Sequence, residues 1–252
     1  MSELIYEVQD QCAWLTLNRP EKRNALNDAL IAVLKEGLRK ANEDESLRAI
    51  VIRGAGKDFC SGADLAALQK ISGNSREENL ADARNLMELY LLIRKVRVPV
   101  IAAVHGRALA GGCGLATACD IVLATDTARF GYPEVKIGFV PAMVTAILRR
   151  NLGEKKSFEL LTQGFEFSAV EAENLGLVNR VFPEDTFEGD VREYVSVYGK
   201  VSGSAVVLTK NLLYGIEGKT IEDAMDKGAE VNATARETED CKRGIARFLN
   251  KD

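Results

Sequence analysis

The sequence has little histidine, the residue that most metal sites and many hydrolases depend on. Its 252 residues include one, His105. One histidine cannot complete a two-histidine metal site, and a Ser-His-Asp triad would have to use this residue. His105 follows an apolar run that has the pattern of a strand, so we interpret it as structural. We therefore predict no metal site.

Cysteine is also scarce and shows no paired spacing. The five cysteines are an odd number scattered along the chain, which argues against a disulfide framework and against a zinc site: Cys12, Cys60, Cys113, Cys119 and Cys241. No basic residue adjoins Cys60 or Cys113, so neither has the setting of a thiolate nucleophile. We expect the cysteines to be small buried apolar side chains.

The chain lacks both an excess of positive charge and long apolar runs. Lys and Arg number 33 against 37 Asp and Glu, so no overall positive field attracts nucleic acid or an anionic membrane. The first seven residues have neither the basic nor the apolar region of a signal peptide, and no apolar run reaches membrane-spanning length. We expect a cytoplasmic protein with no nucleic-acid partner and no membrane partner.

What is present is an alternation of apolar strands and amphipathic helices. The pattern predicts a hairpin over 4–17, a helix capped by Asn27, strands over 48–54, 98–104 and 120–124, and helices over 76–96 and from about 112. Repeated units of this kind each leave an apolar face to cover, which favours an α/β fold of layers stacked in a spiral. Strand patterns stop after 183. We therefore expect a core over 1–190 and a helical region over 191–252.

Two glycine-containing motifs follow apolar strand-like runs. They are Phe59-Cys60-Ser61-Gly62-Ala63-Asp64-Leu65 and Ala110-Gly111-Gly112-Cys113-Gly114. Free backbone N–H groups at two strand ends can converge on one substrate oxygen, and a helix N-terminus adds partial positive charge that suits a developing enolate. Glycines also let two backbones simply pack closely, and the residues alone leave both interpretations open. A phosphate-binding loop fits less well, because the Lys-Ser/Thr ending is missing.

Together with Phe130-Gly131-Tyr132-Pro133-Glu134, these motifs resemble the crotonase (enoyl-CoA hydratase/isomerase) family, and the resemblance runs nearly end to end. It implies a crotonase-like spiral of repeated β-β-α units with a helical C-terminal region, which in the family builds homotrimers that pair into homohexamers. It also implies an enzyme of acyl-CoA and fatty acid metabolism, either an enoyl-CoA hydratase, which is a lyase, or an enoyl-CoA delta-isomerase. No separate cofactor is implied, since coenzyme A is part of the substrate.

The resemblance assigns three catalytic positions. Ala63 and Gly111 match the residues whose amides form the oxyanion hole, and Glu134 matches an acid/base position. The family's other acid position is Gly114 here, so one carboxylate is missing. A carboxyl group in an apolar acyl pocket has its pKa raised towards neutrality, which suits proton transfer. On residues alone, Glu134 could instead be a surface glutamate paired with Lys136 or an arginine.

The resemblance also implies a set of substrate-binding residues. Lys22, Arg23 and Ala25 fall on the nucleotide-contacting loop, and Ser61, Asp64 and Leu65 flank the oxyanion loop. Phe248 and Lys251 match a C-terminal Phe-x-x-Lys that reaches the nucleotide of a neighbouring subunit. Where hydratases carry Pro-Gly-x-Gly-Gly-Thr, this chain has Pro141-Ala142-Met143-Val144-Thr145-Ala146. We expect a reshaped acyl pocket, with Gly114 leaving compensating space.

The reaction itself stays open at this point. A single carboxylate suits isomerisation, in which one base moves a proton from the α-carbon to the γ-carbon of a 3-enoyl-CoA. Hydration would need a water held by other groups, although single-glutamate hydratases exist in the family. The alternatives are a non-catalytic acyl-CoA-binding or RNA-binding paralogue, and a CoA-thioester hydrolase or decarboxylase. The acidic balance of the chain counts against RNA.

Overall fold

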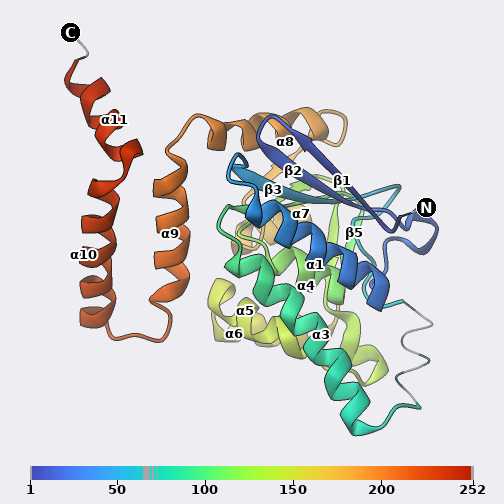
Figure 1. The fold of residues 1–252 in the computed structure, drawn as a ribbon. Helices are drawn as coiled ribbons and strands as arrows, with labels where there is room; N and C mark the ends of the chain where they lie inside the picture. Colours follow the sequence, from blue (N-terminus) through green and yellow to red (C-terminus); the bar gives the residue numbers. More distant parts are fainter. Residues whose placement is uncertain (1, 65–68, 70, 72, 251–252) are drawn as a thin grey trace.

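The structure, a computed structural model, describes residues 2–64, 69, 71 and 73–250 (Figure 1). Its strands are β1 (Leu4–Gln9), β2 (Cys12–Leu17), β3 (Ala49–Gly54), β4 (Val100–Val104), β5 (Arg107–Leu109), β6 (Ile121–Thr125), β7 (Arg129–Gly131), β8 (Glu166–Ser168) and β9 (Arg180–Phe182). Its α-helices are α1 (Asp28–Glu43), α3 (Arg76–Lys95), α4 (Gly111–Ala118), α5 (Ala142–Leu152), α6 (Glu154–Gln163), α7 (Ala169–Leu175), α8 (Phe187–Ser196), α9 (Gly203–Gly215), α10 (Ile221–Glu237) and α11 (Glu239–Leu249). Short 3-10 helices are η1 (Pro20–Lys22), η2 (Pro133–Ile137) and η3 (Val197–Gly199).

The main sheet has the strand order β1-β2-β3-β4-β6-β9. β1 pairs with β2 in antiparallel fashion, and the remaining pairs are parallel. Both faces are buried: Leu15 and Ile52 belong to the core shared with α1, α3 and α4, whereas Trp14 and Val51 pack with side chains of α8. A parallel sheet covered on both faces needs apolar residues in unbroken runs, which is the pattern of β2, β3 and β4.

A second, smaller sheet has the order β5-β7-β8. The chain leaves the main sheet at His105 and Gly106, between β4 and β5. Gly106 has a φ of +57, and a Cβ there would lie 2.0 Å from the Lys57 carbonyl oxygen. His105 Nε2 lies 3.0 Å from the Gly56 carbonyl oxygen, which fits the structural role predicted for it. The segments β1-β2-α1 and β4-β5-α4 each consist of two strands followed by a helix. This repeat confirms the predicted stacked β-β-α organisation.

Helix capping explains why the predicted boundaries are close to the observed ones. Asn27 caps α1, its side chain accepting a hydrogen bond of 2.7 Å from the Leu30 amide. Ser75 and Glu78 form a capping box at the start of α3. The sequence did not predict β5, β7 and β8, because three residues are too few to show a strand period.

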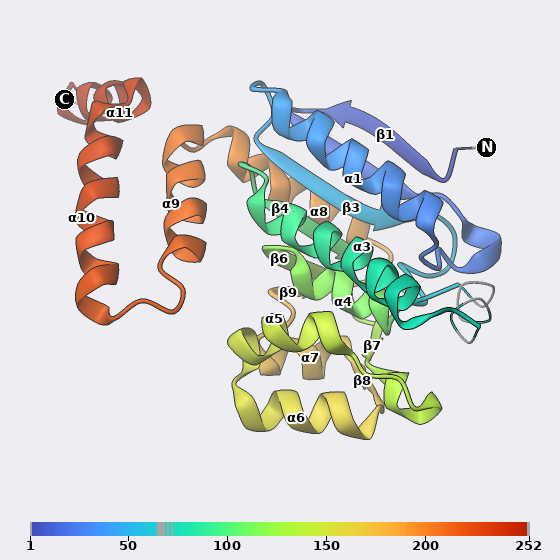
Figure 2. The ribbon, with the colours of Figure 1, turned by 60° about the horizontal axis from the view of Figure 1, so that its bottom comes forward.

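The C-terminal helices α9, α10 and α11 stand beside the α/β body (Figures 1 and 2). α9 attaches to the body through buried Lys210, whose Nζ donates to Asp120 Oδ2 at 2.7 Å. The expected boundary at 190 lies within α8. Val191 and Val195 of that helix are buried against the main sheet, so α8 belongs to the body and the separate helices begin with α9.

Four cysteines are buried, and burial raises the pKa of the Cys60 and Cys113 thiols to about 12. These thiols are therefore neutral at physiological pH. Cys241 departs from the expectation, because it lies on α11 and is only partly buried. Within the described residues, no helix combines the length and apolar character needed to cross a bilayer. The same part of the chain contains no group of three or more His, Cys, Asp or Glu that could hold a metal ion.

Candidate active site

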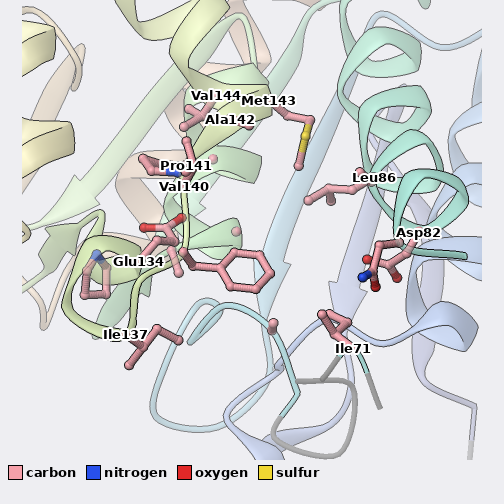
Figure 3. Close-up of a pocket in the computed structure, with 18 of the residues that line it drawn as sticks. Ile71, Asp82, Leu86, Glu134, Ile137, Val140, Pro141, Ala142, Met143 and Val144 are labelled. Atoms are coloured by element: carbon pink, nitrogen blue, oxygen red, sulfur yellow. The ribbon is translucent and has the colours of Figure 1, made fainter. Parts of the chain in front are cut away.

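A cavity of ≈ 650 Å³ opens between α3, the start of α4, and the segment from η2 into α5 (Figure 3). Most of its wall is apolar, and the apolar residues labelled in Figure 3 are Ile71, Leu86, Ile137, Val140, Pro141, Ala142, Met143 and Val144. A few polar groups interrupt this wall, among them Ser61, Asn79, Asp82 and Glu134. A largely apolar chamber with few polar groups is typical of a small-molecule site and suits an acyl chain.

Ala63 lies at one edge of this cavity, on the loop after β3. The Leu26 amide donates to the Gly62 carbonyl at 2.7 Å, and the Asp64 amide donates to the Leu26 carbonyl at 3.0 Å. In this parallel pairing, Leu26 bonds to the residues before and after Ala63. The N–H of Ala63 itself is then directed to the side of its strand opposite Leu26. The Ala63 amide therefore points away from Leu26.

Gly111 lies at the same cavity and is the first residue of α4. The opening amides of a helix have no intrahelical acceptor and carry partial positive charge. The preceding residue, Ala110, has φ 48 and ψ −125, a strained conformation for a non-glycine residue. Its amide donates to the Gly131 carbonyl at 2.9 Å, which ties this turn to β7.

Close backbone contacts bring the Ala63 loop and the α4 turn together. A Cβ on Gly62 would lie 2.8 Å from the Ala110 Cβ, and a Cβ on Gly112 would lie 2.2 Å from the Cys60 carbonyl oxygen. Any larger residue at Gly112 must push the two loops apart. The tight packing considered for the glycine cluster is thus present, and it is what brings both amide-bearing turns to one cavity.

Glu134 is the carboxylate of the site. It lies in the first turn of η2, which Pro133 opens, and its side chain points into the cavity (Figure 3). Its Oε2 is buried and has no hydrogen-bond partner among the described residues. Burial raises the pKa of Glu134, the direction predicted from the sequence. No described residue forms an ion pair with it, so surface pairing with Lys136 or an arginine does not occur.

The compensating space expected beside Gly114 is absent, because Tyr90 of α3, which was not predicted as a site residue, fills it. The Tyr90 hydroxyl donates to the Gly111 carbonyl at 2.8 Å, and Tyr90 lines the cavity. Asn79 and Asp82 of α3 were also missed, and Figure 3 shows Asp82 across the cavity from Glu134. In an amphipathic helix these residues carry no local mark that distinguishes a cavity wall from an ordinary core or surface position.

The predicted nucleotide loop lies next to the cavity. The Ser61 amide donates to the Arg23 carbonyl at 3.0 Å, and Ser61 lines the cavity. Buried Asn24 fixes this loop, its Nδ2 donating to the Asp58 carbonyl at 2.8 Å. Lys22 and Arg23 are exposed, and Arg23 pairs with Asp58 at 3.8 Å, whereas Ala25 is buried.

The other predicted substrate contacts are not all brought to the cavity. The Asp64 carboxylate is buried and pairs with Arg19 at 2.7 Å, so its side chain is engaged within the protein. Leu65 and Lys251 lie outside the described residues. Phe248 is 79% exposed on α11, and Figure 1 shows α11 well apart from α3 and α4, which line the cavity of the same chain. A contact between Phe248 and a bound nucleotide would therefore need a neighbouring chain.

Comparison with known proteins gives one consistent result. A family model described as enoyl-CoA hydratase/isomerase matches residues 7–252. The chain is 35% identical over 252 residues to a 2,3-dehydroadipyl-CoA hydratase of Escherichia coli, covering 100% of this chain and 97% of that one. It is 34% identical over 250 residues to a crotonyl-CoA hydratase of Syntrophomonas wolfei, covering 98% and 95%. The crystal structure of an enoyl-CoA hydratase from Mycobacterium smegmatis superimposes with a TM-score of 0.95 at 34% identity, covering 100% and 97%.

Proposed function

The chain belongs to the enoyl-CoA hydratase/isomerase family, and we propose that it adds water across the 2,3-double bond of an enoyl-CoA thioester. The observation that carries this proposal is Glu134, whose side chain faces an apolar cavity with one buried carboxylate oxygen, Oε2, unpartnered among the described residues. Two amide-bearing turns reach the same cavity. The similar hydratases act, by their names, on 2,3-dehydroadipyl-CoA and crotonyl-CoA. Because those acyl groups differ, we leave the acyl chain of this substrate undefined.

In this proposal, the Ala63 and Gly111 amides bind the thioester carbonyl oxygen. As water attacks C3, the π electrons move towards that oxygen and an enolate forms. Two fixed N–H donors stabilise the developing negative charge without reorganising, and losing one such donor typically lowers the rate by about 100-fold to 1000-fold. The partial positive charge at the N-terminus of α4 acts in the same direction. The strain at Ala110 is consistent with a turn shaped for binding rather than for stability.

Glu134 moves the proton. As a carboxylate it accepts a proton from water while the water oxygen bonds to C3. The resulting carboxylic acid then donates that proton to C2 of the enolate, which restores both the thioester carbonyl and the Glu134 carboxylate. One carboxylate is sufficient, because C2 and C3 are neighbouring atoms and the same group serves as base and then as acid. Burial raises the pKa of Glu134, which makes its carboxylate a stronger base towards the attacking water.

Isomerisation of a 3-enoyl-CoA is the second candidate, and the missing side chain at Gly114 favours it. Glu134 would remove a C2 proton, and the same carboxyl group would return it at C4. This reaction needs the same two amides and no bound water. It therefore differs from hydration in needing no water positioned beside Glu134.

The proposal also covers how coenzyme A is bound and how the chains assemble. Coenzyme A enters as part of the substrate, with Lys22 and Arg23 near its phosphates. In this proposal the chain forms homotrimers or homohexamers, and Phe248 of one chain reaches the nucleotide bound by its neighbour. In support, the C-terminal helices expose large apolar side chains that a partner chain could cover: Leu213, Ile221, Met225, Ile245, Phe248 and Leu249.

A mass-spectrometric assay with a mixed pool of 2-enoyl-CoA and 3-enoyl-CoA thioesters tests the proposal. We expect a product heavier by one water from the 2-enoyl substrates, and no such product from Glu134→Gln. Conversion of 3-enoyl to 2-enoyl thioesters without a change in mass would select the isomerase. Release of free CoA or carbon dioxide would select a hydrolase or a decarboxylase. No turnover of any thioester, together with binding, would support an acyl-CoA-binding protein.

A further inference from the structure

The space beside Gly114 is occupied by a specific group. A Cβ built on Gly114 would lie 2.4 Å from the Tyr90 hydroxyl oxygen and 3.0 Å from the ring Cζ. Real Cβ atoms do not approach so closely, so no side chain at position 114 can coexist with Tyr90 in its present place. Tyr90 fits at this place because position 114 is a glycine. Its phenol hydroxyl is the polar group in this part of the cavity.

The Tyr90 hydroxyl is held in one orientation. Tyr90 is 3% exposed, and its single hydroxyl hydrogen is donated to the Gly111 carbonyl at 2.8 Å. Burial raises the pKa of Tyr90 well above its ordinary value, so it remains a neutral phenol. A phenol oxygen that donates its hydrogen still has lone pairs with which to accept. Among the described residues, none donates to this oxygen.

Tyr90 and Glu134 line the same cavity from two elements, α3 and η2. The Tyr90 hydroxyl lies against Gly111 and Gly114 at the start of α4, and both glycines line the cavity into which Glu134 points. Tyr90 is a fixed neutral acceptor and Glu134 is a carboxylate acceptor. A water molecule has two hydrogens to donate, so it can satisfy both acceptors at once.

We propose that the Tyr90 hydroxyl oxygen and the Glu134 carboxylate together hold the water that attacks C3, with Tyr90 as a water-positioning residue. This inference rests on the proposed hydration. The water donates one hydrogen to Tyr90 and the other to Glu134, which leaves a lone pair directed at C3. Glu134 takes its hydrogen as a proton while the C3–O bond forms. The hydrogen on the Tyr90 side stays with the oxygen and becomes that of the product hydroxyl.

Two activities of the same site separate this role from mere support of Gly111. Hydration of a 2-enoyl-CoA needs the oxyanion amides, Glu134 and a positioned water. Exchange of a C2 hydrogen of a saturated acyl-CoA with deuterium from D₂O needs the amides and Glu134, but no attacking water. A Tyr90→Phe variant removes the hydroxyl and keeps the ring that fills the space beside Gly114.

We expect Tyr90→Phe to lower the kcat of hydration about tenfold, equivalent to one lost hydrogen bond of about 1.4 kcal/mol, with the KM little changed. Deuterium exchange at C2 of butyryl-CoA should stay within about twofold of wild type, which also shows that the variant is folded. Tyr214→Phe is the matched control, because its hydroxyl donates to Asp120 outside the cavity. That control should leave the ratio of hydration to exchange unchanged.

The outcomes distinguish the inference from the function on which it rests. Equal losses of hydration and exchange in Tyr90→Phe would show that the tyrosine only supports Gly111, and would overturn the inference. Unchanged hydration in Tyr90→Phe would overturn it as well, while leaving the hydratase in place. A wild-type protein that exchanges the C2 hydrogen but adds no water to any 2-enoyl-CoA would overturn the proposed function and this inference together.

Discussion

Positions 114 and 134 match the two acid positions that the family resemblance implies, and their surroundings in this molecule differ. Beside Gly114, a neutral tyrosine fills the space and is fixed by a hydrogen bond of 2.8 Å to Gly111. At 134, a carboxylate faces the cavity with one buried oxygen unpartnered in the described structure. The tyrosine is fixed and neutral, and its oxygen can only accept a further hydrogen bond, whereas the carboxylate can accept a hydrogen bond and also take up the proton. Polar groups that are left unsatisfied in a native structure are more often functional than structural.

The comparison also separates stability from reactivity. A buried hydroxyl that donates a hydrogen bond, such as that of Tyr90, raises the free energy of unfolding, whereas a desolvated carboxylate lowers it. We infer that the reactivity of this cavity is concentrated at Glu134 and that its surroundings are arranged to hold other atoms still. The predictions below test the contrast between the two positions.

The largest effect should come from Glu134→Gln, which removes the only carboxylate assigned to the reaction. We expect kcat to fall by about 100-fold to 10,000-fold, the range typical for loss of a general acid-base group. Binding of a CoA thioester, measured by calorimetry, should be retained. Glu154→Gln is the control, because its side chain is 80% exposed on α6. A Glu134→Gln variant with at least a tenth of wild-type turnover would break the contrast between the two positions.

Gly114→Ala should have the next largest effect. The added Cβ would lie 2.4 Å from the Tyr90 hydroxyl oxygen, so Tyr90 must move and its bond to Gly111 must lengthen. We expect hydration to fall about tenfold or more, and the free energy of unfolding to fall by about 1–3 kcal/mol, as for other overpacked cores. Gly189→Ala on α8 is the matched control, because a Cβ there meets nothing within 4 Å.

Combining Gly114→Ala with Tyr90→Phe sharpens this test. The phenyl ring lacks the oxygen that the new Cβ would strike, so the double variant should lose less stability than the sum of the two single variants. Denaturant unfolding of the four proteins measures this coupling. Strictly additive losses would mean that the two side chains do not compete for the same space.

The pH dependence should report the raised pKa of Glu134. Hydration needs the carboxylate, so kcat/KM should fall on the acid side through a pKa above the ordinary glutamate value. Because the folded-state pKa is raised, the ionised group destabilises the fold as pH rises through that pKa. Glu134→Gln should therefore melt at a higher temperature than wild type at neutral pH. The difference should vanish below the ordinary glutamate pKa, where both proteins are uncharged at this position.

The smallest effect on chemistry should come from the C-terminal helices. Phe248→Ala changes a side chain that is 79% exposed on α11, a helix that stands well apart from α3 and α4 (Figure 1). We expect kcat to change by less than about twofold, because positions 114 and 134 are untouched, while the KM for the CoA thioester rises if a neighbouring chain supplies this contact. Steady-state kinetics and light scattering measure the two effects. A large loss of kcat in an intact assembly would place chemistry outside the two positions compared here.

Much of the fold was predictable because its signals are local. Asn27 begins α1 through a side-chain cap, and the unbroken apolar runs of β2, β3 and β4 mark a sheet buried on both faces. The boundary between the body and the C-terminal helices was less predictable. Residue 190 lies inside α8, and whether a helix packs on its own body or on a partner depends on side chains far away in sequence.

The candidate site divides in a similar way. The turns at Gly62 and Gly112 could be predicted because glycine marks unusual backbone conformations in the sequence. The role of Glu134 came from the family resemblance, because the residues alone also allowed a surface glutamate. The place of Tyr90 in the cavity could not be predicted from the sequence, because it is one aromatic residue within the amphipathic helix α3. Its meaning comes from the contact with Gly114, a position 24 residues away that has no side chain. A missing side chain is visible in the sequence, but the group that takes its place is not.

The central claim is that one carboxylate supports hydration in this cavity. It is tested most directly by incubating wild-type protein and Glu134→Gln with a 2-enoyl-CoA in ¹⁸O-labelled water and following the thioester by mass spectrometry. The account predicts a 3-hydroxyacyl-CoA carrying ¹⁸O from wild type, and almost none from the variant. Equal labelling by both proteins, or turnover of 3-enoyl-CoA alone with no oxygen incorporated, would contradict it.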